Sequence, residues 1–291
     1  MVRGGDDGST TAGRSAPTVA TRLFRILDAF SSERSALTLS AISRHSGLAL
    51  TTTHRLVGEL ASWGALERDS QGKYRIGLRM YELAALAPRG PVLREVAMPF
   101  LGDLYEATHQ NVQLGVLDGL EVVFVERLSG REAVRVVSRV GGRLPLHATG
   151  VGLILLAHAE HAVQEAVLDA PLKRFTSKTI ATPQQLRRVL AEVRRNGFVI
   201  SDGQIELSNL SVAAPVHDET DTVAAALSVV VPSRGADPRA LIPAVRAAAR
   251  GISRALGSPR ALALPASARR EAASRAAPPS RTREESLGDA E

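Results

Sequence analysis

The sequence predicts an α+β protein with two folded domains. Its 291 residues exceed the usual size of a single domain. In the C-terminal two thirds, strand-like and helical patterns mix without a regular β-α-β order, which favours an antiparallel sheet with helices packed on it. The N-terminal third instead shows helical patterns followed by one short hairpin. We therefore expect a small, mainly helical domain followed by a larger mixed one.

Composition narrows the class of protein. Hydrophobic residues make up 44% of the chain and charged residues 23%, as in ordinary globular proteins. No apolar stretch approaches the roughly 20 residues that span a bilayer, and the polar first residues lack the apolar core of a secretory signal. The absence of cysteine excludes disulfides and thiolate metal sites. These features predict a cytoplasmic protein that makes no membrane contact.

Positive charge is concentrated near the N-terminus. The whole chain carries a formal net charge of +6, and between Thr18 and Met80 nine Lys or Arg residues stand against five Asp or Glu. About a fifth of the chain therefore carries most of the net charge. A basic segment of this kind favours a nucleic-acid partner.

The N-terminal domain, residues 17–80, is predicted to begin with three helices. Apolar residues recur at helical spacing over 18–30. Ser40 is a candidate N-cap for a short helix, AISRHS, and Thr51 is one for a third helix that reaches Trp63. A glycine follows each of these two helices, where helices commonly end.

A hairpin is predicted after the third helix. Two short alternating runs over 66–76 flank a Ser-Gln-Gly turn. Helix, helix, tight turn, helix and hairpin, in about sixty basic residues, is the order of a winged helix-turn-helix. The N-terminal domain is therefore predicted to bind DNA.

The third helix has two different faces. On a helical wheel, Leu56, Leu60, Trp63 and Thr53 form a side that would pack against the domain. The opposite side is small and polar, as a helix in the major groove requires. Taken alone, such a face is explained more simply as a solvent-exposed helix surface. The capped helix before it and the basic hairpin after it favour DNA binding instead. The predicted DNA contacts are Thr51, Thr52, His54 and Arg55 from the helix, and Arg68, Lys73 and Arg75 from the wing.

The C-terminal domain, residues 93–257, follows a predicted linker helix over 81–92. A hairpin turns at Asp118-Gly119. Further strands are expected at 134–140, 211–216 and 223–231, and helices at 149–158, 183–196 and 238–256. Residues 1–16 and 258–291 lack a sustained apolar face and are predicted to be disordered tails.

Other chemistry is only weakly indicated. His158 and His161 have helical spacing for a metal but no third ligand, and HDETD at 217–221 is explained more simply as a turn. His147 has no nucleophile or paired carboxylate to act with. We predict no catalytic residue, metal or cofactor. The alternatives are an enzyme fused to a DNA-binding domain and a DNA-binding protein without a ligand.

Two stretches, LTLSAISRHSGLALTTTHRLVGEL and WGALERDSQGKYRIG, resemble the DNA-binding domain of the IclR (isocitrate lyase regulator) family of bacterial transcription factors. The resemblance extends over about residues 18–256. It implies a winged helix-turn-helix joined by a helix to a GAF-like effector-binding domain, without catalytic activity. It also implies a homodimer or homotetramer, a palindromic operator in double-stranded DNA, and a small-molecule effector that is an organic acid or aromatic compound.

The resemblance also implies an effector pocket. Backbone amides of Gly150 and Val151 would meet the effector, and Ser228 would bond its carboxylate. The full set of pocket positions is Val136, Leu144, Gly150, Val151, Ser201, Asp202, Asn209, Ser211 and Ser228. This chain departs from the family at Leu153, at Leu207-Ser208 and at Val230, which implies a less polar pocket and a larger, more apolar effector. Ala49-Leu50 replaces a common Pro-Lys pair before the third helix.

Overall fold

A computed structural model describes residues 17–87 and 90–263. By its internal contacts the chain divides into two compact units, with the boundary after Pro91. The two units are described separately below. The predicted disorder of 1–16 and 264–291 lies outside the described residues. Within the described part, no helix is long and apolar enough to cross a membrane.

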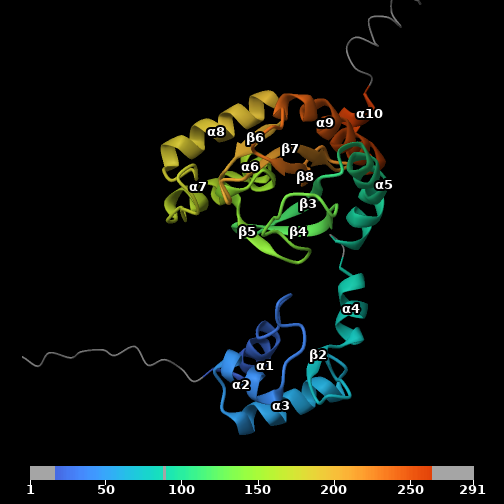
Figure 1. The fold of residues 1–291 in the computed structure, drawn as a ribbon, viewed down its shortest axis with the longest axis vertical. Coiled ribbons are helices and arrows are strands. Elements are labelled where there is room, and N and C mark those ends of the chain that lie inside the picture. The colour runs from blue at the N-terminus through green and yellow to red at the C-terminus, as the bar shows by residue number, and fades with distance from the viewer. Residues whose placement is uncertain (1–16, 88–89, 264–291) are drawn as a thin grey trace, which may run out of the picture. The chain divides into compact units, whose positions relative to one another are not determined.

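The N-terminal unit contains three packed helices and a two-stranded hairpin, as predicted (Figure 1). Ile26, Ile42, Leu56 and Leu66 are fully or almost fully buried and form its core. Leu37 exchanges two backbone hydrogen bonds with Tyr74 of the hairpin, at 2.9 and 2.7 Å, and so ties the hairpin to the segment before the second helix. The elements are α1 (Val19–Asp28), α2 (Leu39–Ser46), α3 (Leu50–Ser62), β1 (Leu66–Arg68), β2 (Tyr74–Ile76) and α4 (Leu78–Ala85).

Two predicted N-caps were each wrong by two residues. The N-cap of α2 is Thr38, whose hydroxyl accepts a hydrogen bond from the amide of Ala41, so Ser40 lies within the helix. Helix α3 begins at Leu50 without a side-chain cap, which places Thr51 in its first turn. The last of the six elements, α4, begins at Leu78, three residues before the predicted linker helix.

The C-terminal unit is built on a six-stranded sheet in which every neighbouring pair is antiparallel, in the order β5-β4-β3-β8-β7-β6. The α+β prediction is therefore confirmed. The strands are β3 (Asn111–Asp118), β4 (Glu121–Leu128), β5 (Arg143–Pro145), β6 (Val199–Asp202), β7 (Asn209–His217) and β8 (Val223–Pro232). The helices are α5 (Pro91–Thr108), α6 (Gly150–His158), α7 (His161–Asp169), α8 (Pro183–Asn196), α9 (Pro238–Ala255) and α10 (Pro259–Leu262), with a 3-10 turn at Leu146–Ala148.

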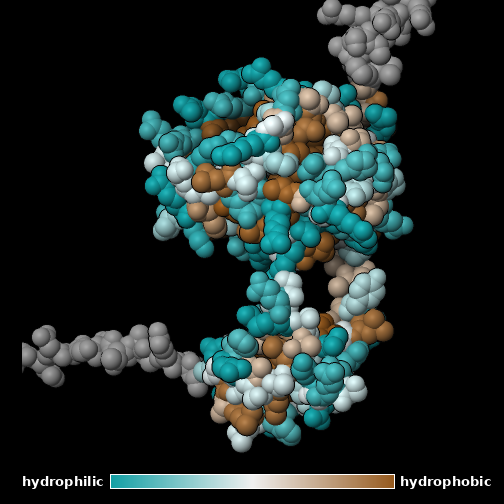
Figure 2. All heavy atoms as spheres, viewed as in Figure 1, coloured by the Kyte–Doolittle hydropathy of each residue, from teal (hydrophilic) through white to brown (hydrophobic). Residues whose placement is uncertain are grey.

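Helices cover both faces of this sheet (Figure 1). Along β7, Val212, Ala214 and Val216 pack in the cluster formed with α5 and α9, whereas Ala213 packs in the cluster formed with α6 and α8. This alternation follows from the period of two residues in a strand. Many apolar residues of this unit are buried between the sheet and the helices. Hydrophilic residues cover much of the surface seen in Figure 2.

The predicted strand at 134–140 was wrong. The segment is irregular, and side chains of the sheet hold its backbone and its one buried serine. The amide nitrogen of Asn111 donates to the carbonyl of Val134, and that of Gln113 donates to the hydroxyl of Ser138, at 2.7 and 2.8 Å. Arg127 donates to the Ser138 carbonyl at 3.0 Å. The segment is therefore fixed to β3 and β4 without forming a strand.

The predicted tail also begins too early. Residues 258–263 include helix α10, whose N-cap Ser258 accepts a hydrogen bond from the Ala261 amide. Ser258 donates to the carboxylate of Asp221 in the turn between β7 and β8, at 2.6 Å. Helix α7 and strands β5 and β6 were not predicted, because each is short and has no clean periodicity.

The start of α6 requires a glycine at position 152. A Cβ atom there would lie 2.4 Å from the carbonyl oxygen of Leu146 and 2.6 Å from the Thr149 hydroxyl. We predict that Gly152→Ala lowers the free energy of unfolding by about 1–3 kcal/mol, because the backbone of the 3-10 turn must shift. Thermal unfolding of the full chain measures this.

Gly102→Ala is the matched control. Gly102 lies within α5, and a Cβ atom added there would meet no atom within 4 Å among the described residues outside its own helix turn. The added methyl group should stabilise the unit by roughly 0.5–1 kcal/mol, as alanine does in a helix interior. Equal effects of the two substitutions would contradict the close contact described for Gly152.

Candidate functional site

Helix α3 presents a small polar surface to solvent. Thr51, His54 and Arg55 are exposed, and Thr52 is partly exposed. Arg55 forms an ion pair with Glu59 one turn later, and both side chains remain more than half exposed. An exposed pair of this kind contributes little stability and is easily exchanged for another anion. The arginine is therefore available to a phosphate or a base edge.

The buried side of α3 differs from the prediction at two residues. Thr53, Leu56 and Val57 are completely buried, so Val57 belongs to the packed side although it was not predicted there. Trp63 was expected on that side but is 52% exposed, with the guanidinium group of Arg79 5.7 Å from its ring centre. Trp63 is the C-cap residue, so the turn that ends the helix carries it away from the core.

The hairpin after α3 carries the predicted wing residues. Arg68 lies over the ring of Tyr74 at 5.7 Å, and Arg75 is 3.3 Å from the carboxylate of Asp69. Hydrogen bonds to Asp69 from the Lys73 amide, and then from the Gln71 amide and Arg75, outweigh desolvation and lower the pKa of this carboxyl group. The turn is therefore fixed by an ionised aspartate, and Arg68, Lys73 and Arg75 project from one short element.

In the C-terminal unit, a cavity of about 70 Å³ lies where the start of α6 meets the sheet. It has space for several water molecules. Eight of the nine predicted pocket residues line it: Val136, Leu144, Gly150, Val151, Ser201, Asn209, Ser211 and Ser228. They come from the irregular segment, β5, α6, β6, β7 and β8, so the fold gathers residues that are far apart in the sequence.

The ninth residue, Asp202, does not line this cavity. Its carboxylate accepts hydrogen bonds from Lys178 at 2.5 Å and Ser233 at 2.6 Å. These bonds, first that of Lys178 and then that of Ser233, lower the pKa of Asp202. Strand residues alternate between faces, so its neighbour Ser201 faces the cavity and Asp202 does not.

The cavity offers hydrogen-bond donors at the N-terminus of a helix. Ser228 is 1% exposed, and within the described part of the chain its hydroxyl has no hydrogen-bond partner. The hydroxyl of Thr149 accepts from the Gly152 amide and caps α6. The first amides of a helix lie outside its own hydrogen-bond ladder and attract negative charge. A Cβ atom at Gly150 would lie 2.4 Å from the Ser211 hydroxyl, so glycine keeps this end of the cavity open.

The lining includes polar residues that were not predicted. Gln113, Ser138, Gln204 and Glu206 line the cavity together with the ring of Phe124. The carboxylate of Glu206 accepts a hydrogen bond from the amide of Asn209 at 2.6 Å. Gln113 could have been found only from the antiparallel pairing of β3 with β8, which sets it opposite Ser228.

Most of the departures that imply a less polar pocket lie outside the cavity. Leu153 is 1% exposed and packs in the hydrophobic core with α8, and it does not line the cavity. Leu207 and Ser208 do not line it either, and of the departures inside the C-terminal unit only Val230 does. A change of residue at 153 therefore alters the hydrophobic core, and the less polar pocket stays a prediction that rests on Val230.

Other candidate groups are used structurally. The Nε2 atom of His147 lies 3.0 Å from the carbonyl of Lys173, so it must carry a proton and donate it. Burial lowers the pKa of His147, which keeps the ring neutral near pH 7. His158 ends α6 and His161 begins α7, so they do not share one helix. Among the described residues, no group of three or more His, Asp or Glu could hold a metal ion.

Comparison with known proteins agrees with this layout. The model of the IclR helix-turn-helix domain matches residues 19–70, and that of the bacterial transcriptional regulator IclR C-terminal domain matches residues 90–254. The HTH-type transcriptional regulator XynR of Escherichia coli K12 is 33% identical over 243 residues, which cover 82% of this chain and 96% of XynR. The glycerol operon regulatory protein of Streptomyces coelicolor is 31% identical over 230 residues, or 77% of this chain and 90% of that protein.

A solved structure resembles the chain over a similar span. The crystal structure of an IclR homolog from Microbacterium hydrocarbonoxydans, complexed with 4-hydroxybenzoate, is 41% identical with a TM-score of 0.78. The match covers 82% of this chain and 99% of that one. The matched domains and relatives together span both described units. This chain therefore belongs to the IclR family of bacterial transcriptional regulators.

Proposed function

We propose that this regulator binds a palindromic operator as a homodimer or homotetramer, and that a small organic carboxylate in the α6 cavity changes its affinity for DNA. The buried hydroxyl of Ser228 supports an effector site in this cavity. It has no partner among the described residues and lines the cavity at the start of α6. A buried polar group without a partner costs free energy, and a ligand that bonds to it recovers that cost.

A carboxylate fits the donors in this cavity. The amides of Gly150 and Val151 begin α6, and the helix dipole favours an anion there. Ser201, Ser211 and Ser228 add hydroxyl groups. Apolar side chains of Phe124, Val136 and Leu144 would contact the body of the effector. The solved relative that holds 4-hydroxybenzoate supports an aromatic carboxylate as the first compound to test.

The DNA contacts follow from the exposed surface of the N-terminal unit. Helix α3 would lie in the major groove, with Arg55 donating to guanine or to phosphate and with Thr51, Thr52 and His54 close to the DNA. Arg68, Lys73 and Arg75 of the wing would contact the sugar-phosphate backbone. Such contacts position the protein without reading bases.

Operator binding tests the function directly. Full-length protein should bind duplexes taken from the DNA flanking its own gene at nanomolar to sub-micromolar concentration, and much more tightly than unrelated duplexes. Titration with 4-hydroxybenzoate and related aromatic carboxylates should change that affinity severalfold. Fluorescence anisotropy of labelled duplexes measures both. A protein that does not distinguish its own flanking DNA from unrelated DNA would contradict the proposal.

Arg55→Ala should weaken specific operator binding by roughly 1–3 kcal/mol if Arg55 makes a bidentate base contact. The same anisotropy measurement checks this. Arg131→Ala removes one exposed arginine from the other unit and serves as the control for net charge. Glu59→Gln removes the carboxylate that pairs with Arg55 and should leave the affinity unchanged or raise it. Normal affinity of Arg55→Ala would remove this residue from the interface.

Ser228→Ala separates ligand binding from folding. Because the hydroxyl has no partner in the described part of the chain, the stability of the free protein should stay the same or rise by up to about 1 kcal/mol. Affinity for an aromatic carboxylate should fall roughly tenfold or more, since a hydrogen bond to a charged group is lost. Calorimetric titration and thermal unfolding measure the two effects. Ser177→Ala, at an exposed serine, should change neither.

A further inference from the structure

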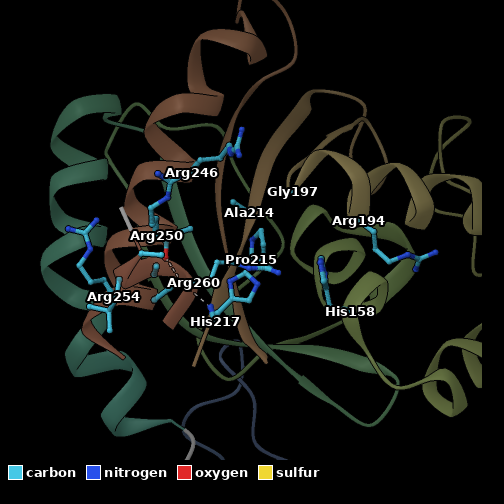
Figure 3. Close-up of a pocket in the computed structure, with 15 residues that line it drawn as sticks. His158, Arg194, Gly197, Ala214, Pro215, His217, Arg246, Arg250, Arg254 and Arg260 are labelled. Atoms are coloured by element: carbon cyan, nitrogen blue, oxygen red, sulfur yellow. Dashed lines mark hydrogen bonds between the residues drawn. The ribbon is translucent and has the colours of Figure 1, made fainter. Parts of the chain in front are cut away.

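A larger groove lies elsewhere in the C-terminal unit and shares no lining residue with the α6 cavity. Its volume is about 660 Å³, within the range of small-molecule sites. Residues of α6, α8, β7, α9 and α10 line it (Figure 3). We call it the arginine groove, because Arg194, Arg246, Arg250, Arg254 and Arg260 all line it.

Carboxylates do not balance this charge. Among the described residues that line the groove, none is Asp or Glu. Arg260 is 3.9 Å from the carboxylate of Asp221, and Arg194 donates to the carbonyl of Ala157 at 3.1 Å. In the part of the chain that the structure describes, Arg246 and Arg250 take part in no ion pair.

Helix α9 concentrates positive charge on one side. It contains four arginines and no acidic residue, and Arg246, Arg250 and Arg254 follow one another at intervals of four residues. Like charges at this spacing repel and destabilise a helix. Arg254 lies in the last turn, where the helix dipole favours a cation, but Arg246 and Arg250 lie too far from the end for this effect. A ligand with negative charge would relieve their repulsion.

One of the two histidines in the groove also responds to the positive charge. The rings of His158 and His217 meet edge to face, with 6.5 Å between their centres. Burial, and then the charges of Arg260 and His158, lower the pKa of His217 against the opposite effects of Asp221 and Asp218. Both rings line the groove, as do the small residues Ala214, Pro215 and Ala249. The groove therefore combines arginines with a small apolar surface.

We propose that the arginine groove binds a phosphorylated small molecule that carries at least two separated anionic groups, as a second ligand site of this chain. Guanidinium groups bind phosphate through paired hydrogen bonds. In Figure 3, Arg246 and Arg250 lie on one side of His217 and Arg194 and His158 on the other, so the positive groups are spread along the groove and would suit more than one anionic group. A rigid DNA duplex presents a broad convex surface, which fits a hollow of this size poorly.

Calorimetric titration of the full chain with inorganic tripolyphosphate tests the proposal. At about 0.15 M salt, exposed charges more than about 8 Å apart are screened, so binding there requires close contact. We expect binding by the unaltered chain and at least tenfold weaker binding by Arg246→Ala and by Arg250→Ala. Arg188→Ala on α8 is the matched control, since Arg188 is exposed, lies 3.8 Å from Glu192 and does not line the groove. The affinity of the Arg188→Ala variant for tripolyphosphate should be unchanged.

Several outcomes would overturn the proposal. The proposal fails if the chain does not bind tripolyphosphate at all, or if all variants bind it with equal affinity. It also fails if the substitutions weaken only the binding of unrelated duplex DNA. Binding that occurs only after deletion of 264–291 would also overturn it, because the acidic residues of that segment would then be the ligand: Glu271, Glu284, Glu285, Asp289 and Glu291. Binding of an aromatic carboxylate should be the same in Arg246→Ala and Arg250→Ala as in the unaltered chain.

Discussion

The contact between the start of α6 and the sheet determines the candidate effector site. Two glycines allow it. At Gly152 the helix comes so close to the Leu146 carbonyl that no side chain fits, and at Gly150 the space next to Ser211 stays open. The remaining residues of α6, from Val151 to Ala157, are buried and fix the helix in the core. The first residues of the helix thereby line the same cavity as Ser228.

The segment at 134–140 shows how irregular backbone contributes to a site. A strand would have used its amides and carbonyls in a ladder with the neighbouring strand. Here side chains of β3 and β4 hold the segment instead, and Val136, Val137 and Ser138 line the cavity. Its alternating valines led to the wrong prediction, since the sequence contains no sign that Asn111 and Gln113 would bond to it. Gln113, which donates to Ser138, also lines the cavity.

Much of the rest could be predicted from the sequence. Long elements with clear periodicity, such as α8 and the β3–β4 hairpin, were predicted because local spacing decides them. Eight of the pocket residues came from resemblance to the family, and the structure brings them together at one cavity. The positions of Asp202 and Leu153 could not be predicted, because they depend on which face of a strand or helix meets the core. The position of Trp63 depends on the turn that ends α3. The arginine groove could not be predicted, because its five arginines come from three helices.

A carboxylate at the N-terminal end of α6 is the interaction that would connect this cavity to DNA binding. A crystal structure of the protein grown with an aromatic carboxylate that alters operator affinity would locate that carboxylate. We expect its oxygens within hydrogen-bond distance of the Gly150 and Val151 amides and of the Ser228 hydroxyl. A compound bound elsewhere, with the Ser228 hydroxyl still unpaired, would contradict this assignment of the site.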